Sequence, residues 1–529
     1  MVNYTVFTTW TIFYNDALHT PSLFFIFLFT CLALSYFLTH LLAWYRTPKS
    51  SFHSILEVYH LSPTGMMPRE AIVKTASGIV TAVLGGSAGP EGPATLITGG
   101  FSVWLSKAAK VRIESNKALM IGVAAGFSAA FKTPLTGILF ALELPFRRDL
   151  EKDAFIEGTL ASSTAYLVSV ALGAPSLLPG LKLDTAIIPS LVIPMSLIFG
   201  FATGSLVLVF TSLYKGAETI AKRLSEKGGY PLMLIVGGLI LGAVGYMSPE
   251  AMGPGYQMIP LLTTGSLMTL IVLLVTKPIV TSMSLTFGGG GGLFLPTLLI
   301  GGSWGAVIAT IIAPEYLAIF ILMGMASFSA GIHKMLLTPV IFVAEVFGSQ
   351  TIIPVILATV IAYFVSGSMS FYPVQPLAKH SQEELALERF YLKVTRRKVK
   401  ELDKLTAKNL MTEKPIRIKA DMTVREAFDV FSRTPFRIMP VVDAQNGVLG
   451  YVSLEDLALL TKTSLDQPLR ESELKQPLLF NEAIPVMKVI AEMISKEEDH
   501  CYVIDEKNRL SGVISTIDAT RLLMRYYTQ

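Results

Sequence analysis

Two stretches rich in glycine and proline interrupt apolar sequence, and their residue types suit the binding of an anion. Residues 89–93 read GPEGP and residues 292–296 read GLFLP. Glycine lets a ligand approach the backbone closely, and proline suits the first turn of a helix. Because N–H groups at a helix start carry partial positive charge, each stretch predicts a helix N-terminus that can hold an anion.

Glu91 is the only acidic residue in these two stretches. As a carboxylate it can occupy the site that an anion would take, and once protonated it loses that attraction and can swing away. Proton binding and anion entry are then linked through competition for one site, so we interpret Glu91 as a gate. The alternative is an ordinary helix N-cap partner that faces water.

The composition places these stretches inside a membrane. Of the 529 residues, 52% are hydrophobic and 16% are charged, against about 25% charged in typical proteins. The first 380 residues hold 36 charged side chains and the last 149 hold 46. This contrast predicts a membrane domain followed by a soluble one. An acid buried in a membrane is costly, which makes function the default interpretation of Glu91.

The same composition excludes other classes of protein. A net charge of +4 without a long Lys/Arg tract gives no electrostatic footprint for nucleic acid. The two cysteines, Cys31 and Cys501, are too few for a disulfide framework or a cysteine-based metal site, and each is expected to be a small buried side chain. No motif indicates an enzyme. The first twenty residues show no removable signal peptide, so the first apolar run is expected to stay in the membrane.

Apolar runs that could cross a bilayer recur along the first 380 residues. They lie near residues 23–44, 71–84, 118–144, 161–172, 187–213, 231–247, 258–275, 296–312, 317–329 and 352–365. Several are shorter than the roughly 20 residues of a straight span. Broken backbone at membrane depth is tolerated where it is buried in protein or lines a polar cavity. Two such breaks in matching halves predict a transport site.

The halves match when the chain is shifted by 202 residues, which aligns residues 122–143 with 324–345 without a gap. Identical pairs are Gly122/Gly324, Ala124/Ala326, Lys132/Lys334, Leu135/Leu337, Thr136/Thr338, Phe140/Phe342 and Glu143/Glu345. Chance similarity of apolar helices favours Leu and Val, whereas these pairs include Gly, Lys, Thr and Glu. The repeat therefore predicts a duplicated bundle with its two glycine-rich breaks facing each other near the midplane.

Basic residues orient this predicted bundle. Arg46 and Lys49 follow the first span, and Arg147, Arg148 and Lys152 follow the run that ends at residue 144. Positive charge is enriched in cytoplasmic loops. These loops and the charged tail are therefore expected to be cytoplasmic.

These motifs, taken in order, resemble those of the CLC family of chloride channels and chloride/proton exchangers. Residues 89–93 look like the family's G-(K/R)-E-G-P motif, residues 292–296 fit its G-x-F-x-P motif, and Tyr372 follows the last span. The resemblance implies an all-α polytopic membrane fold with an inverted internal repeat over residues 1–380. It also implies a homodimer with one pathway per subunit, in the cell membrane, that transports chloride and protons.

The resemblance also implies an anion site built from both halves. The family's G-S-G-x-P motif is degenerate here, with residues 49–53 (KSSFH) in its place, so Ser50 is the best match to the anion-binding serine and Ser51 is the alternative. The anion-binding residues so implied are Ser50, Gly89, Gly92, Gly292, Phe294, Leu295 and Tyr372. We expect the N–H groups of Phe294 and Leu295 to face the ion. The alternative is that Phe294 is a core aromatic and Tyr372 an interfacial residue.

Two departures from the family's pattern bear on function. Pro90 stands where Lys or Arg is usual, which removes a positive charge next to the gate. Lys132 either restores that charge or is a snorkelling or ion-paired lysine. The exchangers commonly have two consecutive acids where this chain has Glu143 followed by Leu144. Either protons take another inner route, through Glu143 and water, or the protein is a passive chloride channel.

The tail contains two related units after a charged linker at 381–408. Residues 409–461 and 474–529 each predict the order strand, helix, strand, strand, helix, with helices at 423–431 and 484–494 and strands at 437–443 and 501–505. They resemble a cytoplasmic pair of α+β CBS domains.

This resemblance implies a site for an adenine nucleotide between the two units. Its residues would come from two Ser-x-x-Asp motifs, Ser453 with Asp456 and Ser515 with Asp518. The alternative is that both serines only cap helices. No Walker motif is present, so a nucleotide would regulate transport and not drive it.

The sequence thus predicts chloride transport through a CLC-type pathway gated by Glu91, with proton-coupled exchange favoured over a passive channel. No cofactor is expected beyond a regulatory adenine nucleotide. A hypothesis of another class is a nucleotide or ionic-strength sensor that the membrane domain merely anchors.

Overall fold

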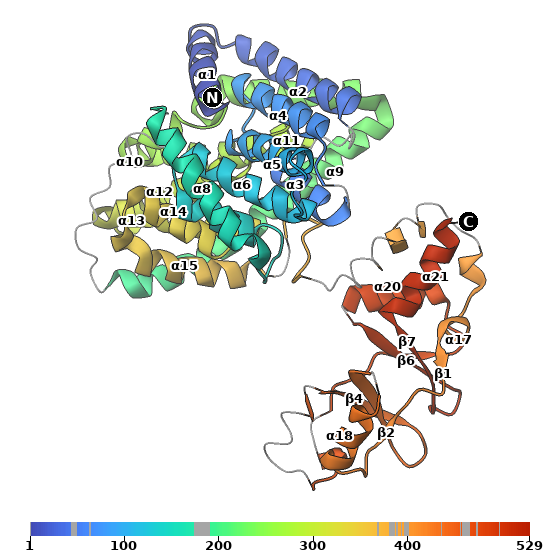
Figure 1. Ribbon diagram of the computed structural model, residues 1–529. Helices are drawn as coiled ribbons and strands as arrows, with labels where there is room; N and C mark the ends of the chain where they lie inside the picture. Colours follow the sequence, from blue (N-terminus) through green and yellow to red (C-terminus); the bar gives the residue numbers. More distant parts are fainter. Residues whose placement is uncertain are drawn as a thin grey trace. The chain divides into compact units, whose positions relative to one another are not determined.

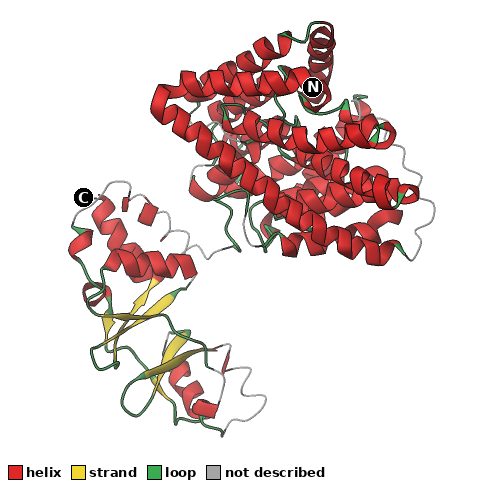
Figure 2. Ribbon diagram, turned by 180° about the vertical axis from the view of Figure 1, so that it is seen from behind, coloured by secondary structure: helices red, strands yellow, loops and turns green. Residues whose placement is uncertain are grey.

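The computed structural model divides into two compact units, Met1–Lys379 and His380–Gln529, each described here by itself (Figures 1 and 2). The residues that the structure describes are 2–43, 50–62, 65–173, 191–367, 370–379, 387, 390–392, 394–395, 401–434, 436–454, 456–457, 466–471, 474–496 and 498–528. Parts of the linker expected at 381–408, its basic cluster at 396–398, and Arg46 and Lys49 lie outside them.

The first unit is helical. Its first half contains α1 (Val2–His19), α2 (Leu23–Leu42), α3 (Ser51–Leu61), α4 (Pro68–Val83), α5 (Glu91–Ala108), α6 (Ser115–Phe131), α7 (Pro134–Glu143) and α8 (Phe155–Ala171). Its second half contains α9 (Val192–Met247), α10 (Met258–Thr264), α11 (Leu267–Thr286), α12 (Phe294–Ile312), α13 (Leu317–His333), α14 (Leu337–Phe347) and α15 (Ile352–Val365). Among the described residues, five helical segments are long and apolar enough to cross a membrane: α2, α9, α11, α12 and Pro314–His333.

Two of the apolar runs, 118–144 and 258–275, are each divided between two helices. The first run divides into α6 and α7, because Lys132 takes a left-handed conformation with φ of 61° and Pro134 starts a new helix. The second divides into α10 and α11 at Gly265, where the Ser266 hydroxyl accepts a hydrogen bond from the N–H of Thr269 and caps α11. Both breaks are only a few residues long, so hydropathy averaged over a window of about 19 residues does not reveal them.

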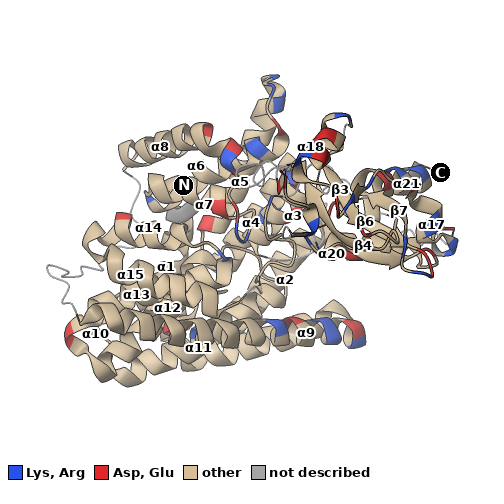
Figure 3. Cartoon of the chain, turned by 90° about the horizontal axis from the view of Figure 1, so that it is seen from below, with Lys and Arg blue, Asp and Glu red and all other residues tan. Residues whose placement is uncertain are grey.

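Charged residues are scarce in the helical unit. Figure 3 shows α12 and α13 without charged residues, while charges gather on part of α9. That helix kinks at Gly228 and Gly229, where φ and ψ leave the helical region. The kink separates the two apolar runs that the sequence placed at 187–213 and 231–247.

The two halves of the unit share their local structure. α5 packs against α6 as α12 packs against α13. Lys132 and Lys334, which the repeat aligns, both end their helices in the left-handed conformation. At the aligned Gly122 and Gly324, an added Cβ would lie 2.4 and 2.0 Å from a backbone oxygen of the neighbouring helix. The small residues at these positions allow close helix packing in both halves.

The second unit contains two α/β motifs. The first has β2 (Ile418–Lys419), α18 (Val424–Ser432), β3 (Ile438–Val442) and β4 (Val448–Ser453); the second has β5 (Leu479–Asn481), α20 (Val486–Lys496), β6 (His500–Ile504), β7 (Leu510–Ser515) and α21 (Thr516–Thr528). Before them lie α17 (Ala407–Leu410) and β1 (Thr412–Glu413). The sheet orders are β2-β3-β4 and β1-β7-β6-β5, and in each motif a parallel pair is followed by an antiparallel one.

The strand and helix order of the tail agrees with the prediction over the described residues. α18 begins one residue later than expected because Thr423 is its N-cap in a capping box with Glu426. The motifs contact each other through Val442, Tyr502 and Leu510. Cys31 and Cys501 are both buried, as expected.

Candidate anion-binding site

The two glycine-rich stretches lie against each other, as the repeat predicts. Gly89 N–H donates to the Gly292 carbonyl at 2.8 Å, and Gly292 N–H donates to the Gly89 carbonyl at 2.9 Å. α5 begins at Glu91 and α12 begins at Phe294, directly after these paired residues. Two helix starts are therefore brought together in the interior of the bundle.

The Glu91 carboxylate occupies the space between these helix starts. Its side chain is fully buried, and the N–H of Leu295 donates to Oε1 at 3.2 Å. Oε2 has no hydrogen-bond partner among the described groups. A Cβ on Gly89 would lie 2.0 Å from Oε2, and one on Gly292 would lie 2.2 Å from Oε1. Glycine at both positions leaves room for the carboxylate, which rests on the positive end of α12.

Ser50 and Tyr372 approach the same region from α3 and from the segment after α15. Ser50 is the N-cap of α3, with its hydroxyl accepting from the N–H of His53 at 3.3 Å. Ser51 N–H donates to the Gly291 carbonyl at 2.9 Å, which ties α3 to the second glycine-rich stretch. Tyr372 is fully buried and its hydroxyl interacts with Ser50. The two hydroxyls that the resemblance implies are thus adjacent.

Ser51 also lies in this region. Its hydroxyl is buried with no hydrogen-bond partner among the described groups, and it would lie 2.6 Å from a Cβ on Gly92. A cavity of about 60 Å³ opens beside Ser50 and is lined by Ser50, His53, Thr211, Tyr214, Lys215, Glu218, Phe371 and Pro373. Polar and charged side chains therefore line the cavity next to Ser50.

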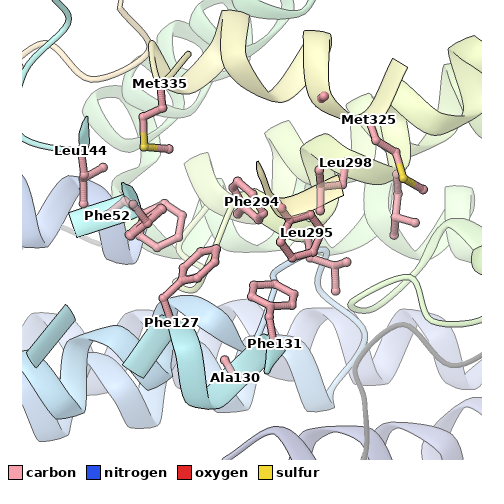
Figure 4. Close-up of a cluster of buried hydrophobic side chains, with 14 of the residues drawn as sticks. Phe52, Phe127, Ala130, Phe131, Leu144, Phe294, Leu295, Leu298, Met325 and Met335 are labelled. Carbon is pink, nitrogen blue, oxygen red and sulfur yellow. The ribbon is translucent and has the colours of Figure 1, made fainter. Parts of the chain in front are cut away.

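Phe294 has both of the roles considered for it. Its N–H group belongs to the helix start that meets the Glu91 carboxylate. Its ring is buried in an aromatic cluster, with centroids 5.1 Å from Phe127, 5.8 Å from Phe131 and 5.3 Å from Phe342. Figure 4 shows Phe127, Phe131 and Phe294 gathered in this cluster. The packed ring fixes the helix start that carries the N–H donors.

Glu143 and Glu345, which the repeat aligns, each cap the helix that carries the other. Glu143 accepts hydrogen bonds from the N–H groups of Leu336, Leu337 and Thr338 and from the Thr338 hydroxyl, at 2.7–3.1 Å. Glu345 accepts from the N–H groups of Leu135 and Thr136 and from the Thr136 hydroxyl, at 2.5–2.9 Å. A carboxylate at one helix end thus satisfies the orphan N–H groups that begin its partner.

Lys277 and His333 are among the buried titratable residues that the sequence did not single out. Lys277 is fully buried in α11, and its Nζ donates to the carbonyls of Ala251 at 2.9 Å and Gly253 at 2.8 Å, with no acidic partner among the described residues. His333 ends α13, and its Nδ1 lies 2.7 Å from the Tyr372 hydroxyl. Their only sequence signal was a single basic residue within or beside an apolar run.

The four Ser-x-x-Asp residues of the second unit form two capping boxes. In each, the serine hydroxyl accepts from the aspartate N–H while the aspartate accepts from the serine N–H and hydroxyl. Asp456 also pairs with Lys475 at 2.9 Å. Among the described residues, a larger cavity of about 920 Å³ is lined instead by residues including Lys408, Glu482, Asp505 and Arg509.

Comparisons with known proteins agree with this architecture. The pattern of the family described as voltage gated chloride channel matches residues 31–367, and that of the CBS domain matches 407–460 and 473–525. An H(+)/Cl(-) exchange transporter from Salmonella paratyphi B is 30% identical over 338 residues, which cover 59% of this chain and 70% of that protein. The corresponding protein of Salmonella arizonae is also 30% identical over the same lengths.

Solved structures share the fold. A crystal structure of a eukaryotic CLC transporter covers 98% of this chain and 94% of its own, with a TM-score of 0.60 and 18% identity. A CLC-type fluoride/proton antiporter covers 72% and 94%, with a TM-score of 0.61 and 23% identity. A slow cyanobacterial Cl-/H+ antiporter covers 70% and 95%, with a TM-score of 0.61 and 19% identity.

The helical fold and the facing helix starts define the class, a multi-pass membrane protein that transports anions and is not an enzyme. More particularly, the chain belongs to the voltage gated chloride channel family, with a C-terminal pair of CBS domains.

Proposed function

We propose that the protein exchanges chloride for protons, with Glu91 as the gate and proton acceptor. The observation that carries this proposal is the buried Glu91 carboxylate at the first N–H groups of α12. A dehydrated chloride needs several weak donors and no fixed counter-charge, or it would bind and not leave. The N–H groups of Phe294 and Leu295 and the hydroxyls of Ser50 and Tyr372 supply such donors. Deprotonated Glu91 competes with chloride for them, and protonated Glu91 does not.

Proton coupling is supported by the relatives and by the site. The Salmonella relatives are named as H(+)/Cl(-) exchange transporters. A gate that must gain a proton to yield its place links each chloride to a proton. Glu143 is one candidate for passing the proton inward, although four donors from α14 already surround it.

A passive chloride channel is the second candidate, and Leu144 favours it. Its side chain is fully buried and cannot bind a proton at the position where the resemblance leads us to expect an acid. The same glutamate gate would then open and close a pathway with no proton stoichiometry.

Chloride efflux from proteoliposomes, recorded with a chloride electrode and a pH electrode together, tests the proposal. Proton movement driven against its own gradient by chloride establishes exchange. Chloride flux without proton movement identifies a channel. No anion flux, together with tight nucleotide binding, favours the membrane-anchored sensor.

We also propose that the second unit binds a regulatory adenine nucleotide through Ser453, Asp456, Ser515 and Asp518. The support is the CBS pattern over both motifs and the matching geometry of the two capping boxes. Isothermal titration of the full chain with ATP and AMP tests this, since Asp456→Asn with Asp518→Asn should abolish the binding heat.

The same reasoning extends to topology and assembly. The segment before Lys379 is held to the loop after α7: Arg147 and Arg148 N–H groups donate to the carbonyls of Pro376 and Leu377 at 3.0 and 2.8 Å. Loop and segment therefore share one side of the membrane, and their basic residues support the cytoplasmic side. We propose a homodimer in the cell membrane with one pathway per subunit and both CBS domains in the cytoplasm.

A further inference from the structure

The pathway inward from Glu91 lacks an acid at the expected place. Leu144 is apolar and buried, and both oxygens of Glu143 accept hydrogen bonds from the start of α14. If the protein exchanges protons, either water or another side chain carries them between Glu91 and the cavity beside Ser50, here called the inner cavity. His333 is a titratable side chain in that region.

His333 is held at both ring nitrogens. Nδ1 lies 2.7 Å from the Tyr372 hydroxyl, and Nε2 lies 3.2 Å from the Thr297 hydroxyl. The side chain is fully buried, and the rings of Phe52 and Phe294 flank it with centroids 5.8 Å away. An imidazole fixed in this way can accept a proton at one nitrogen and release one from the other.

The two hydrogen bonds of His333 lead to different parts of the site. Thr297 belongs to the first turn of α12, the turn whose Leu295 N–H holds the Glu91 carboxylate. Tyr372 interacts with Ser50, which lines the inner cavity. His333 therefore joins the helix start that holds the gate to the hydroxyls beside the cavity.

We propose that His333 carries protons between Glu91 and the inner cavity. This rests on the proposed exchange function. The imidazole takes up at Nε2, by way of the Thr297 hydroxyl, a proton that comes from Glu91, and releases its Nδ1 proton to the Tyr372 oxygen. Tyr372 in turn passes its own hydroxyl proton to water in the cavity. One proton enters this relay and one leaves, and the ring is left as its Nε2–H tautomer. Loss of that proton and gain of one at Nδ1 restores the starting tautomer.

The same geometry links the proton to the anion. When Nδ1 accepts from Tyr372, the single hydroxyl hydrogen of the tyrosine is used and cannot face chloride. When Nδ1 carries a proton and donates to the tyrosine oxygen, that hydrogen is free to bind the anion. The surrounding elements carry many ionisable groups, among them Glu91, Tyr372, Lys334, Glu143, Glu345, Tyr363, Tyr214, Lys215, Glu218, and His53 with its partner Glu57.

The test replaces His333 in the full chain and records chloride and proton fluxes together in proteoliposomes. His333→Gln offers an amide donor and acceptor in place of the two ring nitrogens but cannot take up a proton. Tyr372→Phe removes the hydroxyl that follows His333 in the proposed proton relay and leaves His333 in place. His60→Gln is the matched control, because His60 is also a buried histidine. Its Nε2 is hydrogen-bonded to the Pro145 carbonyl, outside the proposed proton relay. Glu143→Gln tests the competing inner route.

The proposal expects His333→Gln to keep chloride flux while proton flux falls by at least about tenfold, the scale of a lost positioned proton carrier. Tyr372→Phe should lose proton flux as well, and His60→Gln and Glu143→Gln should stay coupled. Proton flux at the wild-type ratio to chloride in His333→Gln or Tyr372→Phe overturns the proposal, as does loss of coupling in Glu143→Gln alone. If the wild-type protein itself moves no protons, the exchange function fails, and this proposal fails with it.

Discussion

At the scale of single residues, the proposed function rests on the Glu91 carboxylate, which takes a proton and competes with chloride for the same donors. One oxygen accepts from the first turn of α12, while the other is buried without a partner among the described groups. A buried carboxylate with an unsatisfied oxygen is costly. Protonation and release from the helix start relieve that cost, and the vacated donors are those that chloride needs.

The two serines at the start of α3 should differ in their contribution to the anion. Ser50→Ala removes the hydroxyl beside Tyr372 and should lower chloride affinity about tenfold, as expected for a hydrogen bond to a charged group worth roughly 1.5 kcal/mol. Ser51→Ala is the matched control and should have the smaller effect. Chloride binding measured by calorimetry in detergent checks this order, and the reverse order would reassign the anion-binding serine.

Asp456 should make the stability of the second unit depend on pH. Burial alone would raise its pKa, but the Ser453 hydroxyl, the Lys475 ammonium and the Ser453 N–H together lower the pKa below its usual value. Because the folded pKa lies below the unfolded value of about 3.9, the ionised carboxylate stabilises the fold above that pH. This stabilisation is lost as the pH falls through the folded pKa.

Asp456→Asn should therefore lower the stability of the unit near pH 7 and converge with wild type in acid. Denaturant unfolding of the full chain between pH 3 and 7 measures the difference. A difference that does not shrink below about pH 4 would contradict the assigned cause.

At the scale of elements, the reciprocal caps of α7 and α14 hold the two halves of the repeat together. Each short helix is too short to be stable alone, and each receives a carboxylate from the other at its N-terminus. The arrangement explains why glutamate recurs at both aligned positions without any need for proton transfer.

Removing either cap should destabilise the helical unit. Glu143→Gln and Glu345→Gln should each cost about 1–3 kcal/mol, because the orphan N–H groups keep only a neutral acceptor. Thermal unfolding in detergent checks this, with Glu157→Gln as a control, since Glu157 forms an exposed pair with Lys117. Unchanged stability in both cap variants would contradict the structural role.

Much of the site could be predicted from sequence because it is local. The glycine and proline residues at 89–93 and 292–296 predict two helix starts, and the internal repeat predicts that these face each other. His333 could not be assigned a role, because its partners Thr297 and Tyr372 are 36 and 39 residues away and only packing brings them together. The breaks in the runs at 118–144 and 258–275 span only a few residues, too few to show in hydropathy averaged over a window of about 19 residues.

At the scale of the whole molecule, the proposed anion site lies entirely within the helical unit. Every residue of that site lies before Lys379, and the CLC-type fluoride/proton antiporter matches only 72% of this chain while covering 94% of its own. Lys379 pairs with Glu151 at 3.0 Å and Asp153 at 2.6 Å, which fastens the segment that follows Tyr372. This fastening holds the pKa of Asp153 below its usual range.

A chain that ends at Lys379 should therefore still transport chloride, within about threefold of the full protein, because an independent domain keeps its own core. A chain that ends at Gly367 lacks Tyr372 and the fastened segment and should not. Proteoliposome flux compares the two. Loss of transport in the chain that ends at Lys379 would show that the CBS pair is needed for the pathway itself.

Glu91→Gln tests the central claim most directly. Chloride flux and proton flux are recorded together from proteoliposomes between about pH 4 and pH 7.5, an interval that begins near the usual glutamate pKa of about 4.3. Glutamine cannot become an anion, so it cannot compete with chloride at the start of α12. We predict chloride flux that no longer varies with pH and is accompanied by no proton flux. Chloride and proton fluxes with the wild-type rate, pH dependence and coupling would contradict the account.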